Sequence, residues 1–190
     1  AEEIIATMEN DGNKVVSDLI LGNQAAPVLF FKHMTHHLHD LDWSFMKNTI
    51  NIILTRNPVF MLPSYAKQVK QPAIYDVGYA LHLELLDYLH SIGQNPPVLD
   101  STQTLRNPRS VLSQLCHQIG LPFDEAMLSW PAEPRPEDGV WAKFWYHTVH
   151  QSTEFKKYSG NDDPFPEHLR PLLAECQPYY EKLSAMAIQA

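Results

Sequence analysis

A histidine-rich segment with a lysine at its head is the first part of the chain that could do chemistry. Residues 30–41 read FFKHMTHHLHDL, and Lys32 directly precedes the histidines. These are His33, His36, His37 and His39. An imidazole can accept a proton near neutral pH, and a nearby ammonium stabilises charge on a group in transfer. The segment therefore predicts a proton-transfer site, with a solvated loop accounting for some of the histidines.

The same segment could instead bind a metal ion and serve a hydrolase. A zinc site needs at least three donors that converge at about 2.0 to 2.1 Å. The segment leaves a predicted strand, however, and no HExxH-like pattern supplies a partner glutamate. We therefore predict no metal and keep the metal-dependent hydrolase as an alternative. Its ligands would be His33, His36, His37 and Asp40 or Asp42.

A second candidate site is an anion pocket at the end of another strand. In LTRNPVFMLPS, Arg56 ends a predicted strand, and Ser64 follows eight residues later at a predicted helix start. A guanidinium can bind a phosphate through two parallel N–H bonds, and the free N–H groups of a helix N-terminus complete such a pocket. The spacing alone favours a structural alternative, in which Arg56 pairs with an aspartate and Ser64 caps a helix.

The elements that must position these residues alternate between short apolar runs and helical patterns. Strands are predicted over 27–32, 50–56 and 96–100. Helices are predicted over 40–48, 75–93 and 107–120, with a further one entered at Pro63. This alternation indicates an α/β domain with a parallel sheet. In such sheets the chemistry gathers at the carboxyl ends of the strands, where Lys32, Arg56 and Asp100 fall.

The helix over 107–120 has the clearest end signals, because Asn107 can cap it, Pro108 suits its first position and Gly120 can end it.

Two further helices are predicted in the last third of the chain. An aromatic helix over 140–152 places Trp141 and Trp145 on one face, more typical of core packing than of a ligand wall. The tail predicts a helix that Pro171 and Pro178 interrupt.

Composition limits the possible functions. The chain has 190 residues, of which 44% are apolar, enough for one domain with a sizeable core. A net charge of −8 argues against general nucleic-acid binding, which needs an excess of Lys and Arg. No apolar run reaches the roughly 18 residues of a membrane span, and the acidic start does not resemble a signal peptide. Cys116 and Cys176 form no CxxC pair, which fits a reducing cytoplasm.

Three stretches resemble the P-loop sulfotransferase-like family. They are VLFFKHMTHHL, INIILTRNPVFMLPSYAKQ and VLDSTQTLRNPRSVLSQLCHQIGLPFDEAMLSWPAEPRPEDGVWAKFWYHTVHQST. The resemblance runs from about Pro27 to about Phe155 and is densest between Pro97 and Thr153. The most similar subgroup includes sulfotransferase domains linked to aminotransferase-like proteins.

The resemblance implies an activity and the residues that serve it. Such enzymes move a sulfuryl group from 3′-phosphoadenosine 5′-phosphosulfate (PAPS) to an acceptor hydroxyl or amine, without a metal. Arg56 and Ser64 match the family's arginine and serine, which hold the 3′-phosphate of the donor. Lys32 matches the lysine at the end of the preceding strand, which serves the transfer.

The match departs from the family at the general base. Many members have a histidine two residues beyond the lysine, where this chain has Met34. His33, His36 or His37 would have to act instead. We place His36 first, because it lies just past the predicted strand end, and His37 second.

The resemblance also implies the fold. We expect a three-layer parallel sheet with helices on both faces, as in P-loop NTPases. This α/β domain should cover residues 1–158, and a helical C-terminal extension, 159–190, should pack on it. The family's 5′-phosphosulfate loop, close to P-R-[ST]-x-S-T, has no counterpart here. We expect its strand to lie outside these residues, since the predicted strands would otherwise lack a central neighbour.

The function predicted from the sequence is a cytoplasmic, PAPS-dependent sulfotransferase-like domain. It would act on a small-molecule acceptor, without nucleic-acid or membrane partners. The first alternative is a non-catalytic nucleotide-binding or interaction module on the same fold, favoured by the missing loop and the displaced histidine. The second is the metal-dependent hydrolase.

Overall fold

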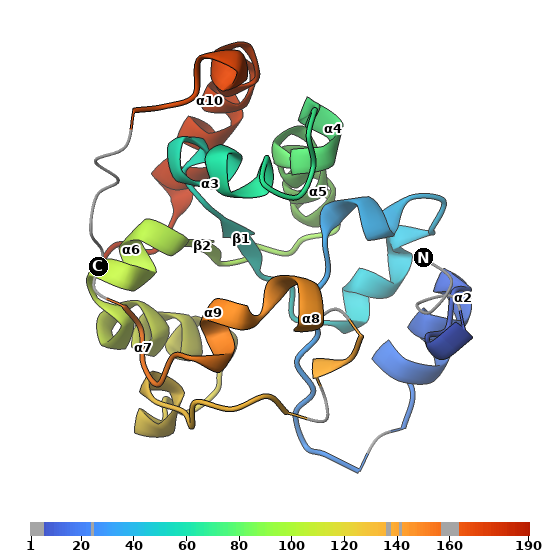
Figure 1. The fold of residues 1–190 in the computed structure, drawn as a ribbon. Helices are drawn as coiled ribbons and strands as arrows, with labels where there is room; N and C mark the ends of the chain where they lie inside the picture. Colours follow the sequence, from blue (N-terminus) through green and yellow to red (C-terminus); the bar gives the residue numbers. More distant parts are fainter. Residues whose placement is uncertain (1–5, 24, 136–137, 141, 157–163) are drawn as a thin grey trace.

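The computed structural model describes residues 6–23, 25–135, 138–140, 142–156 and 164–190, apart from the side chains of Phe144 and Trp145. Within these ranges the protein is mostly helical and contains a small parallel sheet (Figure 1). The sheet consists of β1 (Ile53–Thr55) and β2 (Val98–Asp100). The predicted α/β class with parallel strands is therefore confirmed in its coarse form.

The helices described before β1 are all short, whereas both short and longer helices follow it. Before β1 lie α2 (Gly12–Lys14), the π-helix η1 (Val15–Ile20) and the 3-10 helices η2 (Thr35–Leu38) and η3 (Trp43–Asn48). Between the strands lie α3 (Pro58–Tyr65), α4 (Ile74–Val77) and α5 (Tyr79–Ser91). After β2 come α6 (Ser101–Arg106), α7 (Pro108–Ile119), η4 (Glu125–Leu128), α8 (Ala142–Trp145), α9 (His147–His150), η6 (Glu167–Leu169) and α10 (Arg170–Met186). The part of the chain described here has no helix long and apolar enough to cross a membrane.

The two strands pair directly with each other in parallel. Their register joins Ile53 to Val98 and Thr55 to Asp100. These two strands therefore need no strand between them, and the position of the family's first strand stays a prediction. The chain end extends the pairing, because Ala187 forms a parallel bridge with Val98 and Ile188 donates its N–H to the Val98 carbonyl at 2.9 Å.

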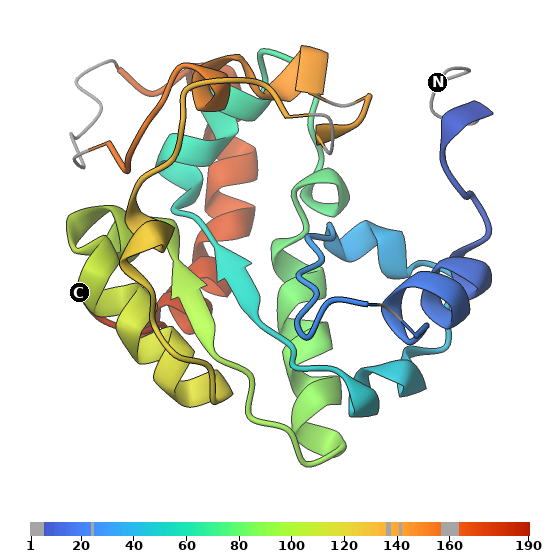
Figure 2. The same cartoon turned by 90° about the horizontal axis from the view of Figure 1, so that it is seen from below.

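Helices pack against both sides of this strand pair. On one side Ile53 and Val98 share a buried cluster with Leu86 of α5 and Leu183 of α10. On the other side Ile52 and Leu99 pack against a second cluster, which contains Val111 and Leu115 of α7 and Ile188 near the chain end. Figure 2 shows the strands between α7, in yellow-green, and α5 and α10, in green and red. A third cluster joins α3, α5 and α10 through Leu62, Tyr79, Leu172 and Cys176.

The strand predicted over residues 27–32 does not form. The segment has no regular secondary structure and pairs with no described strand, and its apolar side chains are exposed, Val28 to 54% and Phe30 to 81%. An apolar composition favours a strand, but a strand also needs a partner elsewhere in the chain. The prediction was wrong for lack of that partner, and Lys32 consequently lies in a loop and not at a strand end.

The helix expected from Pro63 begins earlier, at Pro58. Asn57 caps it, with its side-chain oxygen accepting the Val59 N–H at 2.9 Å. Pro58 occupies the first helical turn, where proline is well tolerated, and Pro63 lies inside the helix. The preference of proline for a first helical turn holds, but it applies to Pro58 and not, as predicted, to Pro63.

Several other boundaries differ from the predictions. The helix expected over 75–93 is divided at Gly78 into α4 and α5, and the aromatic helix is divided into α8 and α9. Trp141 lies outside the described residues, as does the side chain of Trp145, so their shared face stays a prediction. The tail helix is not interrupted, because Pro171 falls in its first turn and α10 continues through Pro178. The helix α6 was not predicted.

Candidate functional site

The histidine segment forms one short helical turn after an exposed loop. Lys32 is exposed, and η2 carries His36 and His37. The rings of His36 and His37 meet edge to face, with centroids 5.0 Å apart, and the ring of His33 lies 6.2 Å from that of His37. The fold therefore gathers three of the four histidines near Lys32.

This crowding affects proton binding by two of these imidazoles. Partial burial lowers the pKa of His33. Partial burial also lowers the pKa of His37, and the neighbouring His36, His33 and Lys32 lower it further by charge repulsion. A lowered histidine pKa keeps the ring neutral at pH 7, which is the form that can accept a proton.

The histidines do not assemble a metal centre. Among the residues that the structure describes, no group of three or more His, Cys, Asp or Glu side chains is arranged to hold a metal ion. His39 instead lies 3.3 Å from the carboxylate of Asp40, with both side chains exposed. The ligand set of the hydrolase alternative is thus not brought together.

Arg56 lies where the sequence predicted, directly after β1. It is exposed, and its guanidinium forms no hydrogen bond or ion pair with any described residue. The structural alternative, in which Arg56 forms an ion pair with an aspartate, is not seen within the described residues. A free guanidinium beside the start of α3 is available to an anion.

Ser64 does not lie at a helix start. It occupies the last turn of α3 and is exposed. Ser64 follows the cap Asn57 by seven residues, which is close to two helical turns, so both lie on one face of the helix. Arg56 and Ser64 can bind the same phosphate only if this face of α3 is turned toward Arg56. Their shared phosphate site stays a prediction.

Asp100 lies at the end of β2, on the strand-end edge that the sequence predicted. It is buried, with 1% of its surface exposed. One carboxylate oxygen accepts the N–H groups of Thr102 at 2.6 Å and Gln103 at 3.2 Å, and so caps α6. Asp100 is therefore a structural part of the edge that also carries Arg56.

Sequence reasoning missed Tyr79. Its hydroxyl donates to the backbone carbonyl of Arg56 at 2.6 Å, and only 3% of the residue is exposed. Burial raises the pKa of Tyr79, so the phenol stays protonated and can donate at neutral pH. Nothing in the local pattern indicates a contact between positions so far apart; the available signal was Gly78, a glycine within a helical pattern.

Gly78 connects this tyrosine to the histidine segment. Its φ of +70° is in the left-handed region that favours glycine. A Cβ atom on Gly78 would lie 2.5 Å from the hydroxyl oxygen of Thr35, the first residue of η2. The two candidate sites therefore meet at Gly78 and Tyr79, which we call the Gly78–Tyr79 joint.

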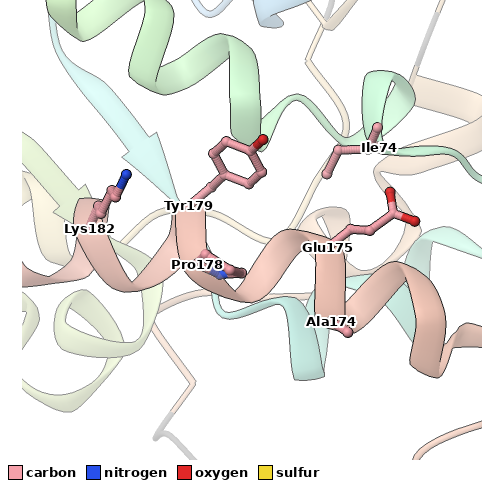
Figure 3. A pocket seen from close by; sticks show the side chains of 6 residues that line it. All are labelled: Ile74, Ala174, Glu175, Pro178, Tyr179 and Lys182. Carbon is pink, nitrogen blue, oxygen red and sulfur yellow. The ribbon is translucent and has the colours of Figure 1, made fainter.

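A groove lies between α10 and α4. Its volume is about 400 Å³ (Figure 3). The lining comes mostly from α10 and consists of Ala174, Glu175, Pro178, Tyr179 and Lys182, with Ile74 from α4. None of the site residues predicted from the sequence line this groove, so the groove is not part of the candidate site.

Comparisons with known proteins place the chain in a protein family. Residues 1–187 match a family described as a sulfotransferase domain. Two similar relatives are the branched-chain-amino-acid aminotransferase-like proteins 2 and 1 of Arabidopsis thaliana, 35% and 36% identical over 96% of this chain. The chain spans 33% of the length of each of these relatives. No solved structure matches the chain significantly.

Proposed function

Because the chain belongs to the sulfotransferase domain family, we propose that it transfers a sulfuryl group from PAPS to an acceptor hydroxyl or amine. The observation that carries this proposal is the family match, which covers nearly the whole chain. The proposal includes the finer fold, a P-loop type of sheet in which the observed strand pair takes part.

Arg56 and Ser64 are assigned to the 3′-phosphate of the donor. Support comes from the exposed guanidinium of Arg56, which no described side chain neutralises. The start of α3 directly after Arg56 adds the positive end of a helix dipole to the same region. Ser64 would add a hydroxyl from the same helix, two turns further on.

Lys32 and one histidine of η2 are assigned to the transfer itself. The acceptor atom attacks sulfur, the bond between sulfur and the 5′-phosphate oxygen breaks, and adenosine 3′,5′-bisphosphate leaves. The histidine takes the proton of the acceptor, and the Lys32 ammonium offsets the charge that builds up on the leaving phosphate. His36 and His37 both remain candidates, and the lowered pKa of His37 supports a neutral, proton-accepting ring at that position.

A second candidate function is nucleotide binding without catalysis. The specific observation in its favour is Met34, which stands where many family members have the catalytic histidine. In this case the pocket at Arg56 would still bind adenosine 3′,5′-bisphosphate, but no sulfuryl group would move.

The experiment uses the full encoded protein, incubated with PAPS and a panel of small hydroxyl and amine acceptors. Release of adenosine 3′,5′-bisphosphate, measured by chromatography, should require protein and rise with one class of acceptor. Calorimetric binding of this nucleotide without turnover on any acceptor would favour the non-catalytic module. Absence of both binding and turnover would overturn the sulfotransferase proposal.

A further inference from the structure

We infer that the Gly78–Tyr79 joint positions Arg56 for the 3′-phosphate of an adenine nucleotide and holds the histidine segment against the same point. The inference rests on the proposed function and deepens it, because it names residues outside the predicted site that set the geometry of nucleotide recognition. Tyr79 is a positioning residue, since its hydroxyl acts on the ligand only through Arg56.

The first contact of the joint fixes the backbone of Arg56. The carbonyl of Arg56 accepts the Tyr79 hydroxyl proton at 2.6 Å, and the next residue, Asn57, caps α3 through the Val59 N–H at 2.9 Å. The turn between β1 and α3 is therefore held on both sides of the peptide that follows Arg56. A guanidinium reads a phosphate through two parallel bonds, so the orientation of its backbone affects affinity directly.

The side chain of Arg56 is left open by the same arrangement. It is exposed and makes no ion pair or hydrogen bond within the described ranges, although its carbonyl is firmly bound. Arg56 therefore combines a fixed backbone with an unpaired side chain, which is the arrangement expected of a group that is preorganised for a ligand. A purely structural arginine would instead be expected to satisfy its guanidinium within the protein.

The second contact of the joint fixes the histidine segment. Gly78 has a φ of +70°, and Thr35 approaches it so closely that a Cβ atom would meet the Thr35 hydroxyl oxygen at 2.5 Å. Thr35 begins η2, the turn that carries His36 and His37. Gly78 and Tyr79 are neighbours in the sequence. Tyr79 contacts Arg56, which is assigned to the phosphate, and Gly78 contacts the start of η2, which is assigned to proton transfer.

Tyr79→Phe tests the first contact, because it removes the hydroxyl and keeps the buried ring. In the full encoded protein, calorimetry with adenosine 3′,5′-bisphosphate should show a Kd raised about threefold to tenfold by loss of one neutral hydrogen bond. Adenosine 5′-monophosphate, which lacks the 3′-phosphate, should bind the variant and the wild type equally. A tyrosine with only a structural role would alter both affinities together or neither.

Tyr88→Phe is the matched control. Tyr88 lies on the same helix, its ring packs edge to face on Trp43 at 5.4 Å, and its hydroxyl has no hydrogen-bond partner in the described part. This variant should keep both nucleotide affinities.

The second contact is tested by Gly78→Ala, with Gly93→Ala as its control. Gly93 also has a positive φ, +83°, but a Cβ atom there would meet nothing within 4 Å. Both variants carry the backbone strain, and only Gly78→Ala carries the clash, so only Gly78→Ala should lower the affinity for the bisphosphate. Adding Thr35→Ala to Gly78→Ala removes the close oxygen and should restore most of the lost affinity.

Different results overturn different statements. If the wild-type protein binds neither nucleotide, the proposed function fails and this inference fails with it. If the wild type binds the bisphosphate but Tyr79→Phe keeps its affinity and its preference over the monophosphate, only the inference fails. A Gly78→Ala variant that Thr35→Ala does not rescue would disprove the connection to the histidine segment.

Discussion

Thr55 and Asp100 are register partners at the ends of β1 and β2, and each buries a side-chain oxygen that has no hydrogen-bond partner within the described part of the protein. Thr55 is exposed to 2% and Asp100 to 1%. The oxygens concerned are Oγ1 of Thr55 and Oδ2 of Asp100. A buried polar atom without a partner costs stability that an apolar atom of the same size does not.

Thr55→Val should therefore leave the free energy of unfolding unchanged or raise it by about 1 kcal/mol. Valine has the shape of threonine and removes the unpaired hydroxyl. Urea denaturation measures the change. Thr104→Val is the control: the Thr104 hydroxyl donates to the Asp100 carbonyl at 3.0 Å, so this variant should lose about 1 kcal/mol. A Thr55→Val variant less stable than Thr104→Val would show that the Thr55 hydroxyl has a partner after all.

Arg56→Ala should weaken the binding of adenosine 3′,5′-bisphosphate more than tenfold. Loss of a charge-assisted contact costs about 1.5 to 3 kcal/mol, and about 1.4 kcal/mol corresponds to a factor of ten. Titration calorimetry on the full encoded protein is the measurement. Arg170→Ala is the control, because Arg170 is an exposed arginine that pairs with Glu167. Equal affinities for wild type and Arg56→Ala would remove Arg56 from the phosphate site.

Lys32→Ala should mainly lower kcat, because its charge is needed most while the sulfuryl group transfers. Loss of one electrostatic donor of this kind costs about a hundredfold to a thousandfold in kcat. Steady-state kinetics with the acceptor that supports turnover measures it, and Lys47→Ala, another exposed lysine, should have no effect. An increase in KM alone would mean that Lys32 only binds substrate.

The general base can be identified by comparing His36→Gln with His37→Gln. The variant that lacks the base should lose about a hundredfold or more in kcat, and the other should lose far less. His39→Gln is the control, because His39 faces Asp40 and is exposed. Equal, small losses in both variants would mean that neither His36 nor His37 is the base and would leave His33 as the candidate.

Acid should destabilise the protein through His82. Burial lowers the pKa of His82 to about 4, and its Nδ1 finds no partner among the described residues. In the unfolded chain His82 binds a proton near pH 6.5, whereas in the folded protein it does so only near pH 4. The contribution of His82 to the free energy of unfolding is therefore complete above pH 6.5 and declines as the pH falls to about 4.

The measurement is the free energy of unfolding across that pH range. In wild type, His82 should contribute a slope of up to about 1.4 kcal/mol per pH unit, which His82→Leu should lack. His90→Leu, an exposed position on the same helix, should keep the wild-type slope. If His82→Leu and wild type lose stability in parallel, His82 is not the group responsible.

Local signals predicted the elements whose ends are set by their own residues. The helix α7 runs from Pro108 to Ile119, with Asn107 as its cap and Gly120 in the left-handed conformation at its end, as the sequence indicated. The position of Arg56 was predicted in the same way, since it directly follows an apolar strand.

Contacts between distant positions could not be predicted. The segment 27–32 has the composition of a strand, but pairing depends on what lies beside it in space. The bond from Tyr79 to Arg56 crosses a whole helix and loop, so no window of sequence contains it. Gly78 was a visible signal, and its meaning became clear only when Thr35 was found against it.

The position of α10 in the core has a consequence for the way the protein is made. Each buried cluster found in the described residues contains a side chain from the stretch between Leu169 and Ile188. A ribosome releases the chain from its N-terminus, so β1, β2 and α7 emerge before the residues that cover them. Until Ile188 is free, the nascent chain exposes its apolar surfaces to chaperones and to other chains. Nonsense or frameshift mutations within α10 should therefore lead to degradation of the product, even though the candidate site upstream is intact.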